Sequence, residues 1–234
     1  SRAADAFCLL APDGVDLERY AHLPSPAAAR AQLSGLNLQP GTFTAGYTGH
    51  LYPGRGTDLL LELAAALPQI QFLLVGGEPG DIDRLQQAIN LRRLHNIHLA
   101  GFVPNAALPL YQAACDTLLM PYGPRVAASS GGNIARYLSP MKLFEYMACE
   151  RPILSSDLSV LREVLHPGNA LLLPPEDLTA WVEAMHQLVD NPPLGSALAR
   201  QARQDVAQYS WEARASSLIA GLVQRNSPTG NANP

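Results

Sequence analysis

Short apolar runs alternate with amphipathic helical patterns along almost the whole chain, and this alternation limits the fold more than any other feature. The apolar runs predict strands at 7–11, 43–48, 70–75, 97–100, 117–120, 153–155 and 170–173. The other segments predict helices at 27–33, 57–67, 81–94, 106–114, 140–147, 159–165, 178–189, 194–208 and 211–223. Such alternation is typical of a mostly parallel sheet with helices on both faces. We therefore expect an α/β protein with three layers, α/β/α, whose ligands bind at the carboxyl ends of the strands.

The length of 234 residues fits one α/β domain with a full core. We expect this domain to span 1–225, because 226–234 is rich in Ser, Pro, Thr, Gly and Asn and predicts a disordered tail. The first predicted strand begins abruptly, so we expect the chain to be part of a longer protein.

Charge and composition argue against several classes of partner. The net charge of −4 provides no broad basic surface for nucleic acid or an anionic membrane. No apolar run approaches the ~20 residues of a membrane-spanning helix, and no signal peptide opens the chain. Cys8, Cys115 and Cys149 are widely spaced and predict buried thiols in a reducing compartment, so we expect a cytoplasmic protein.

The segment 139–156 is the strongest indication of function. Ser139 and Pro140 predict the cap and first residue of a helix, in which Lys142 and Glu145 share one face. A helix N-terminus that carries a lysine is a place where phosphate can bind. A carboxylate one turn further along could reach the ribose hydroxyls of a nucleotide.

A glycine-rich loop, 46–57, follows the second predicted strand. It departs from the phosphate-loop pattern, because Arg55 stands where that pattern has lysine and Gly56 where it has a hydroxyl residue. The dinucleotide fingerprint is not met either. The glycines could still let backbone amides approach an anion beside Arg55. A plain turn with a solvated arginine is the alternative.

Two further turns and one irregular segment lie at the same predicted edge of the sheet. Gly76 and Gly77 end the third strand and suit either close approach by a ligand or a simple turn. Asn105 is expected to cap the helix after the fourth strand. The irregular segment 121–138 is expected to lie over the ligand cleft, the alternative being an idle insertion. The six histidines lack metal-ligand spacing, and no serine-hydrolase motif occurs.

Taken in order, these motifs resemble the C-terminal domain of retaining glycosyltransferases with the GT-B fold, of the type called glycosyl transferases group 1. The resemblance covers nearly the whole chain. It is carried by residues 12–16, 47–50, 54–56, 74–76, 101–104, 111–116 and 120–121, and by the Ser-Pro-x-Lys-x-x-Glu-Tyr-Met-Ala sequence at 139–148. Each motif alone is weak, and the ordered set is specific.

This resemblance implies a Rossmann-like domain, the C-terminal half of a GT-B fold, that binds a nucleotide diphosphate sugar. It implies that Arg55 and Lys142 hold the diphosphate, that Glu145 holds the ribose, and that Gly76 and 102–103 line the base. No metal or other cofactor is implied, and the catalytic residues stay unassigned. The expected donor-binding residues are Gly49, His50, Arg55, Gly56, Gly76, Gly77, Phe102, Val103, Ser139, Lys142, Leu143 and Glu145.

The chain departs from the family pattern in three places. Tyr137 stands where the first glutamate of the E-x7-E motif is expected, which leaves the contact with the donor sugar open. His50 replaces the loop arginine and gives weaker attraction for phosphate near neutral pH. The N-terminal acceptor domain is absent.

We therefore interpret the chain as the donor-binding half of a glycosyltransferase that acts on a glycan, lipid-linked or small-molecule acceptor. The expected partners are the nucleotide sugar and the acceptor domain, which could also provide peripheral membrane contact. Exposed apolar surface on the last helix could cause self-association. The alternatives are an epimerase-like or phosphorylase-like domain and a degenerate, non-catalytic nucleotide-binding module.

Overall fold

The computed structural model describes residues 12–52, 54–127, 132–135 and 138–226. Its centre is a six-stranded sheet with the order β3-β2-β1-β4-β5-β6, in which all neighbouring strands are parallel. The strands are β1 (Thr44–Thr48), β2 (Gln71–Val75), β3 (Ile97–Gly101), β4 (Thr117–Met120), β5 (Ile153–Ser156) and β6 (Leu171–Leu173). The predicted α/β class and parallel sheet are confirmed. The strand predicted at 7–11 and the tail from 227 lie outside the described residues.

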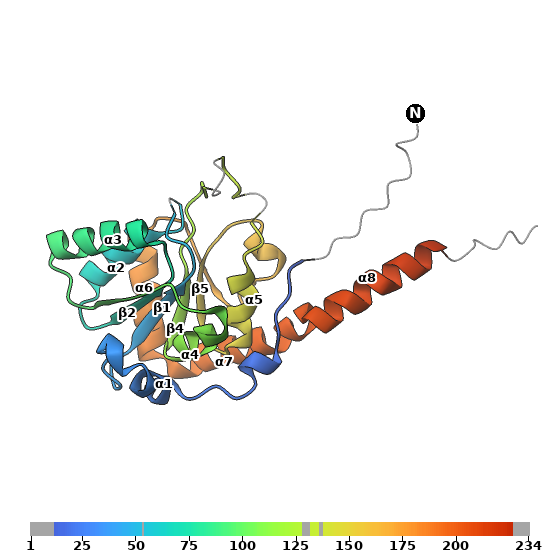
Figure 1. The fold of residues 1–234 in the computed structure, drawn as a ribbon, viewed down its shortest axis with the longest axis horizontal. Helices are drawn as coiled ribbons and strands as arrows, with labels where there is room; N and C mark the ends of the chain where they lie inside the picture. The colour runs from blue at the N-terminus through green and yellow to red at the C-terminus, as the bar shows by residue number, and fades with distance from the viewer. Residues whose placement is uncertain (1–11, 53, 128–131, 136–137, 227–234) are drawn as a thin grey trace, which may run out of the picture.

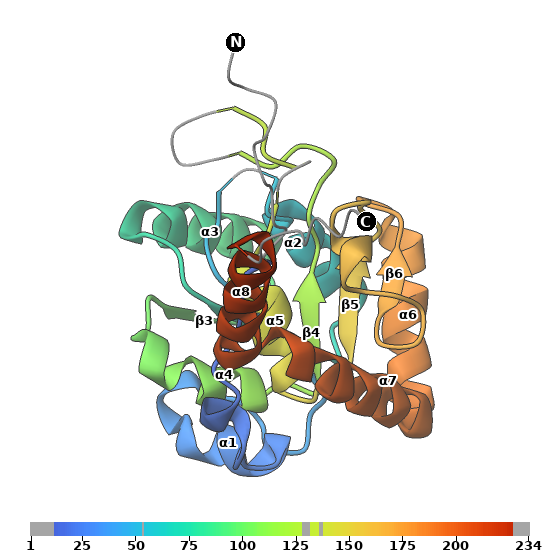
Figure 2. The same cartoon turned by 90° about the vertical axis from the view of Figure 1, so that its right-hand side faces the viewer.

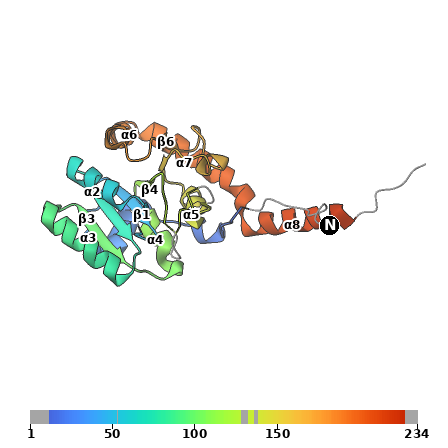
Figure 3. The same ribbon diagram turned by 90° about the horizontal axis from the view of Figure 1, so that it is seen from above.

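Helices cover both faces of the sheet (Figure 1, Figure 3). They are α1 (Pro26–Gln32), α2 (Thr57–Ala66), α3 (Pro79–Arg92), α4 (Leu108–Ala113), α5 (Met141–Ala148), α6 (Leu178–Asp190), α7 (Pro192–Asp205) and α8 (Trp211–Asn226). Helices α2, α3 and α6 pack into one buried cluster with Phe72 and Leu154. Helices α1, α4, α5 and α7 pack into the other with Leu118 and Met120. The two cores on opposite faces confirm the three-layer arrangement.

The carboxyl ends of the strands meet at one edge, which we call the carboxyl edge. Thr48 pairs with Val75, so the turns that follow β1 and β2 lie next to each other. The irregular segment 121–140 lies between β4 and α5, and its described parts, 121–127, 132–135 and 138–140, are at or above this edge (Figure 2). Tyr122 and Val126 of this segment are buried. Its described part is therefore packed onto the domain rather than extended into solvent.

Three helix predictions need correction. The segment 159–165 forms only a 3₁₀ turn, Leu161–Glu163, because a single turn between two strands cannot repay the cost of nucleating an α-helix. The segment 106–114 is divided between a 3₁₀ turn, Asn105–Ala107, and α4. Pro109 has no backbone N–H with which the hydrogen bonds of the 3₁₀ turn could continue. Asn105 begins that 3₁₀ turn, and its side chain does not cap it.

The start of α5 also differs from the prediction. Pro140, not Ser139, is the capping residue, and no side-chain hydrogen bond caps the helix among the described residues. The first backbone N–H groups of α5 are therefore not satisfied by a capping side chain. Leu143, Phe144 and Met147 of this helix are all buried in the core.

Helix α8 projects from the body of the domain (Figure 1). Its start is held by the pairing of Ser210 with Val15 and by an Arg214–Asp13 ion pair of 3.5 Å. Further along, Ile219 and Leu222 are exposed apolar side chains. In the described part of the chain no helix is both long and apolar enough to cross a membrane. Cys115 and Cys149 are buried free thiols, as predicted, and Cys8 lies outside the described residues.

Candidate functional site

Lys142 is the only lysine of the chain, and it lies in the first turn of α5. Its Nζ is 3.8 Å from the centre of the Tyr47 ring and 5.4 Å from that of Tyr122. It is buried, and Nζ has no hydrogen-bond partner among the described residues. Burial and the nearby Arg55 guanidinium hold the pKa of Lys142 well below its ordinary value. The aromatic faces stabilise the cation only in part.

Arg55 approaches the same aromatic ring from the glycine loop. Its guanidinium carbon is 5.5 Å from the centre of the Tyr122 ring, and its buried Nε has no partner within the described chain. The Tyr122 hydroxyl is likewise buried without a described partner. The structure thus brings Arg55 and Lys142 together around one tyrosine, as a cluster of positive charge with which no described acidic side chain forms an ion pair. We call Lys142, Arg55, Tyr47 and Tyr122 the cation cluster.

Two glycines allow the turns at the carboxyl edge to pack against this cluster. A Cβ on Gly49 would lie 2.9 Å from Lys142 Nζ, and a Cβ on Gly76 would lie 2.4 Å from the Gly49 carbonyl oxygen. Both glycines have positive φ angles, 129° and 110°. A side chain at either position would therefore displace the lysine or separate the two turns.

The other glycines of the loop serve chain packing. The space of a Cβ at Gly54 is occupied by the Arg125 carbonyl at 1.9 Å, and that at Gly56 by the Pro121 carbonyl at 2.0 Å. These positions fasten the glycine loop to the segment after β4, which carries Tyr122. We expected the glycines of this loop to allow close approach of a ligand. At Gly54 and Gly56 the neighbouring backbone, and not a ligand, occupies the space that a side chain would fill.

Glu145 lies one turn after Lys142 and is buried. Gln112 Nε2 donates to Glu145 Oε2 at 3.2 Å. Burial raises the pKa of Glu145, and the Gln112 hydrogen bond and the charges of Arg19 and Lys142 oppose that rise. No ion pair joins Glu145 to Lys142 in the described structure.

The remaining predicted residues have diverse surroundings. His50 is exposed and stacks on Tyr52 at 4.9 Å between ring centres, away from the buried part of the cluster. Phe102 is 81% exposed, whereas Val103 packs into the core. The side chains of Val103 and Leu143 both belong to the buried core. Gly77 packs against Leu51, and Ser139 is exposed.

Sequence reasoning missed three residues at this site: Tyr47, Tyr122 and Gln112. Tyr47 is in β1 and Tyr122 directly follows β4, so both lie at the carboxyl edge where an aromatic residue could have been noted. Gln112 lies in the family-like stretch 111–116, but nothing in that stretch indicated that its amide would contact Glu145. In the described residues, no group of three or more His, Cys, Asp or Glu side chains has the arrangement of a metal site.

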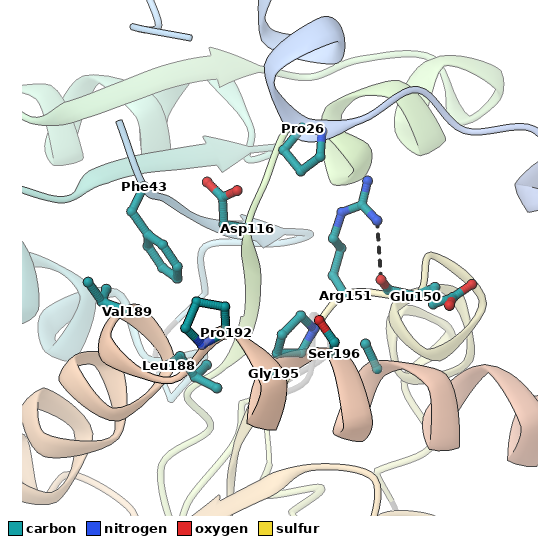
Figure 4. Close-up of a pocket in the computed structure, with 12 residues that line it drawn as sticks. Pro26, Phe43, Asp116, Glu150, Arg151, Leu188, Val189, Pro192, Gly195 and Ser196 are labelled. Atoms are coloured by element: carbon teal, nitrogen blue, oxygen red, sulfur yellow. Dashed lines mark hydrogen bonds between the residues drawn. The ribbon is translucent and has the colours of Figure 1, made fainter. Parts of the chain in front are cut away.

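Two hollows flank the sheet at opposite edges. One opens beside the glycine loop and is lined by Gly54, Arg125, Val126 and Glu176, among others. The other lies at the amino ends of β1, β4 and β5, where Asp116 and Arg151 face Pro26 and Phe43 (Figure 4). Arg151 there already donates to backbone carbonyls of Cys115, Ala113 and Pro24 among others. Arg151 is therefore already paired at this edge, whereas Lys142 Nζ and Arg55 Nε at the carboxyl edge have no hydrogen-bond partner among the described residues.

Comparison with known proteins gives a consistent result. A model of the family described as glycosyl transferases group 1 matches residues 42–191, which is more than half of the chain. Among curated relatives, the D-inositol 3-phosphate glycosyltransferase of Corynebacterium urealyticum is 27% identical over 230 residues, covering 92% of this chain and 50% of that protein.

Two solved structures have the same fold. Sucrose-phosphate synthase from Thermosynechococcus elongatus matches with a TM-score of 0.74 and 27% identity, covering 93% of this chain and 52% of that chain. HepE from Anabaena, solved in complex with UDP, also has a TM-score of 0.74, with 20% identity and coverage of 90% and 56%. The chain thus spans about half the length of the relatives that it matches. It belongs to the glycosyl transferases group 1 family and has the Rossmann-like fold of a C-terminal domain of a GT-B glycosyltransferase.

Proposed function

We propose that this chain binds a nucleoside diphosphate sugar and that the cation cluster receives the diphosphate. The observation that carries the proposal is the pair of basic groups, Lys142 Nζ and Arg55 Nε, that are buried without partners among the described residues. A buried cation is costly unless it is paired. A diphosphate would supply the missing negative charge and the hydrogen-bond acceptors for both groups. The uncapped first turn of α5 would add backbone N–H donors.

Glu145 is the proposed partner of the ribose. It lies one turn below Lys142 on the same helix, so a ligand whose phosphates reach the lysine presents its sugar hydroxyls near the carboxylate. The turn after β2 would then lie near the base, because Gly76 donates its N–H to the Gly101 carbonyl and thereby joins the ends of β2 and β3. A nucleoside diphosphate as the ligand agrees with HepE, which was solved in complex with UDP.

In the whole protein, we propose, the bound sugar is transferred to an acceptor held by a second domain. The name of the curated relative, D-inositol 3-phosphate glycosyltransferase, supports sugar transfer in general and leaves the acceptor of this protein unspecified. Two cations and a helix N-terminus would stabilise the leaving diphosphate without a metal ion. Retention of configuration, the cytoplasmic location and self-association through the apolar surface of α8 stay predictions.

Calorimetric titration of the chain with UDP, GDP and ADP tests this proposal, with uridine and UMP as the matched controls. The account predicts that one diphosphate binds and that removal of its phosphates weakens binding at least tenfold, since a charge-assisted hydrogen bond contributes about 1.5–3 kcal/mol. Absence of binding by all three diphosphates at millimolar concentration would refute the donor site.

The same titration separates the rival functions when it is joined to an activity assay of the full-length protein. Binding of a nucleotide sugar without turnover toward any acceptor would favour the non-catalytic module. Conversion of the nucleotide sugar itself, with no acceptor present, would favour an epimerase-like activity. Acceptor-dependent release of the nucleoside diphosphate is the outcome that the proposal requires.

A further inference from the structure

A chain of buried hydrogen bonds connects the segment before α1 with Glu145. It begins at Tyr20, in the 3₁₀ turn Glu18–Tyr20. The Tyr20 hydroxyl donates to Gln112 Oε1 at 3.0 Å, across 92 positions of sequence. Tyr20 is 4% exposed and Gln112 is completely buried. A polar contact in such surroundings is costly to leave incomplete, so its geometry is strongly specified.

Gln112 uses both protons of its amide nitrogen at the other end. Nε2 donates to Glu145 Oε2 at 3.2 Å and to Thr48 Oγ1 at 3.3 Å. The opposite orientation of the amide would place its oxygen against the Glu145 carboxylate. Tyr20 and Glu145 therefore favour the same orientation, because one offers a donor to Oε1 and the other needs a donor from Nε2.

The far side of this network is also fixed. Thr48 donates from its backbone N–H and from its hydroxyl to the Tyr146 hydroxyl, at 2.8 and 3.2 Å. Tyr146 follows Glu145 directly on α5 and is fully buried. The carboxylate is thus held through Gln112 and through its own helix. No described residue donates a hydrogen bond to the second carboxylate oxygen, Oε1.

We propose that Gln112 and Tyr20 are positioning residues for Glu145, which hold Oε2 so that Oε1 faces the ribose hydroxyls of the nucleotide. The inference rests on the proposed function, in which Glu145 receives the ribose. Gln112 acts directly and Tyr20 acts through Gln112. Neither residue touches the ligand, so their effect is expected only in the part of the affinity that depends on the ribose hydroxyls.

The test compares the affinities for UDP and for 2′,3′-dideoxy-UDP, which lacks both ribose hydroxyls. The ratio of the two dissociation constants measures what the hydroxyls contribute. We expect Gln112→Leu to lower this ratio about tenfold and Tyr20→Phe about threefold, as losses of a hydrogen bond to a charged and to a neutral group. Tyr20→Phe keeps the ring and is the decisive variant if Gln112→Leu does not fold.

Tyr209→Phe is the matched control. Tyr209 packs against Phe144 of α5 with 5.1 Å between ring centres, and it has no part in the hydrogen-bond chain. For the Tyr209→Phe variant, the ratio of the dissociation constants of 2′,3′-dideoxy-UDP and UDP should equal that of the unmodified chain. If Tyr20→Phe and Gln112→Leu weaken both ligands equally, with an unchanged ratio, their role is structural and the inference is overturned.

Glu145→Gln distinguishes failure of this inference from failure of the proposed function. If the unmodified chain and Glu145→Gln have the same ratio, Glu145 does not recognise the ribose and both proposals on it fall. If Glu145→Gln strongly lowers the ratio of the two dissociation constants while Tyr20→Phe and Gln112→Leu leave it unchanged, Glu145 recognises the ribose but Gln112 and Tyr20 do not position it. A graded fall, largest in Glu145→Gln and smallest in Tyr20→Phe, is the expected result.

Discussion

Buried basic side chains occur at both edges of the sheet, but their surroundings differ. Near the amino edge, Arg30 is 5% exposed and its Nη1 donates to the Asp116 carboxylate and to the Ala114 carbonyl, each at 2.8 Å. Its Nε and Nη2 donate to the Pro40 carbonyl. At the carboxyl edge, Lys142 Nζ has no hydrogen-bond partner among the described residues.

The difference in hydrogen bonding indicates a structural role for Arg30 and a ligand-binding role for Lys142 and Arg55. A cation that stabilises the fold is fully paired inside the protein, as Arg30 is. Lys142 and Arg55 instead keep unpaired donors near each other, which costs stability in the free domain. Such an arrangement is understandable if a ligand completes it, since residues that violate the packing rules tend to be functional.

Arg30→Met should have the largest effect on stability. The substitution leaves Asp116 and three backbone acceptor contacts without their donor, so we expect the free energy of unfolding to fall by about 3 kcal/mol. Urea denaturation measures this loss. The nucleotide affinity of the folded fraction should not change. If the free energy of unfolding stays within about 0.5 kcal/mol of wild type, as for a surface substitution, the structural role of Arg30 is contradicted.

Lys142→Met should have the opposite pattern. We expect a loss of UDP affinity of about 30-fold or more, because a charged hydrogen-bond donor to the phosphate is removed. Stability near pH 7 should be unchanged or higher, since an unpaired buried charge becomes an apolar side chain. Calorimetry and urea denaturation on the same preparations give both values.

The pH dependence of stability provides a second readout for this variant. The pKa of Lys142 is lowered in the folded state, so the unfolded chain binds more protons between that lowered value and 10.5. Stability of the wild type should therefore gain a contribution as pH rises through this window, and Lys142→Met should lack it. Identical pH profiles would mean that Lys142 is not buried as a cation.

Arg55→Met should weaken UDP binding less than Lys142→Met does. Arg55 is only partly buried, so solvent screens its charge more strongly. We expect about a tenfold loss of affinity, with stability almost unchanged. Arg125→Met is a useful control, because Arg125 lies beside Gly54 and contacts the glycine loop through its backbone carbonyl. An equal loss in both variants would indicate a nonspecific effect of charge.

His50→Arg should have the smallest effect and should be a gain. His50 is exposed at the start of the glycine loop, where the family pattern has arginine. An added surface charge near a phosphate contributes about 0.3–1 kcal/mol at low salt, or about a twofold to fivefold gain in affinity. The gain should disappear at 1 M salt, where the screening length is about 3 Å. A gain that persists at high salt would point to a direct contact instead.

Much of the fold could be predicted because one signal repeats along the chain. Each strand in the described region was predicted to within two residues at either end, since apolar runs of three to six residues are bounded by glycine, proline and helical patterns. The helix at 159–165 could not be predicted correctly, because a segment of seven residues has the pattern of a helix without the length to form one.

The site could be predicted only where sequence distance is short. Lys142 and Glu145 share one helix, so their spacing alone placed them together. The approach of Arg55 to Lys142 depends on strand order, and the family resemblance rather than spacing suggested it. The contact of Tyr20 with Gln112 joins segments 92 residues apart, and no local pattern encodes it. Tyr137, the unusual residue of the donor motif, lies outside the described residues.

Because Lys142 is the single lysine of the chain, its proposed role as a buried cation that binds a diphosphate can be measured directly. A sample labelled with ¹³C in lysine gives one side-chain ε signal, whose titration by NMR reports the pKa of Lys142 alone. The account predicts a pKa below the ordinary 10.5 in the free chain and a marked rise when UDP is bound, because the phosphates stabilise the charged form. An ordinary pKa that UDP leaves unchanged would contradict it.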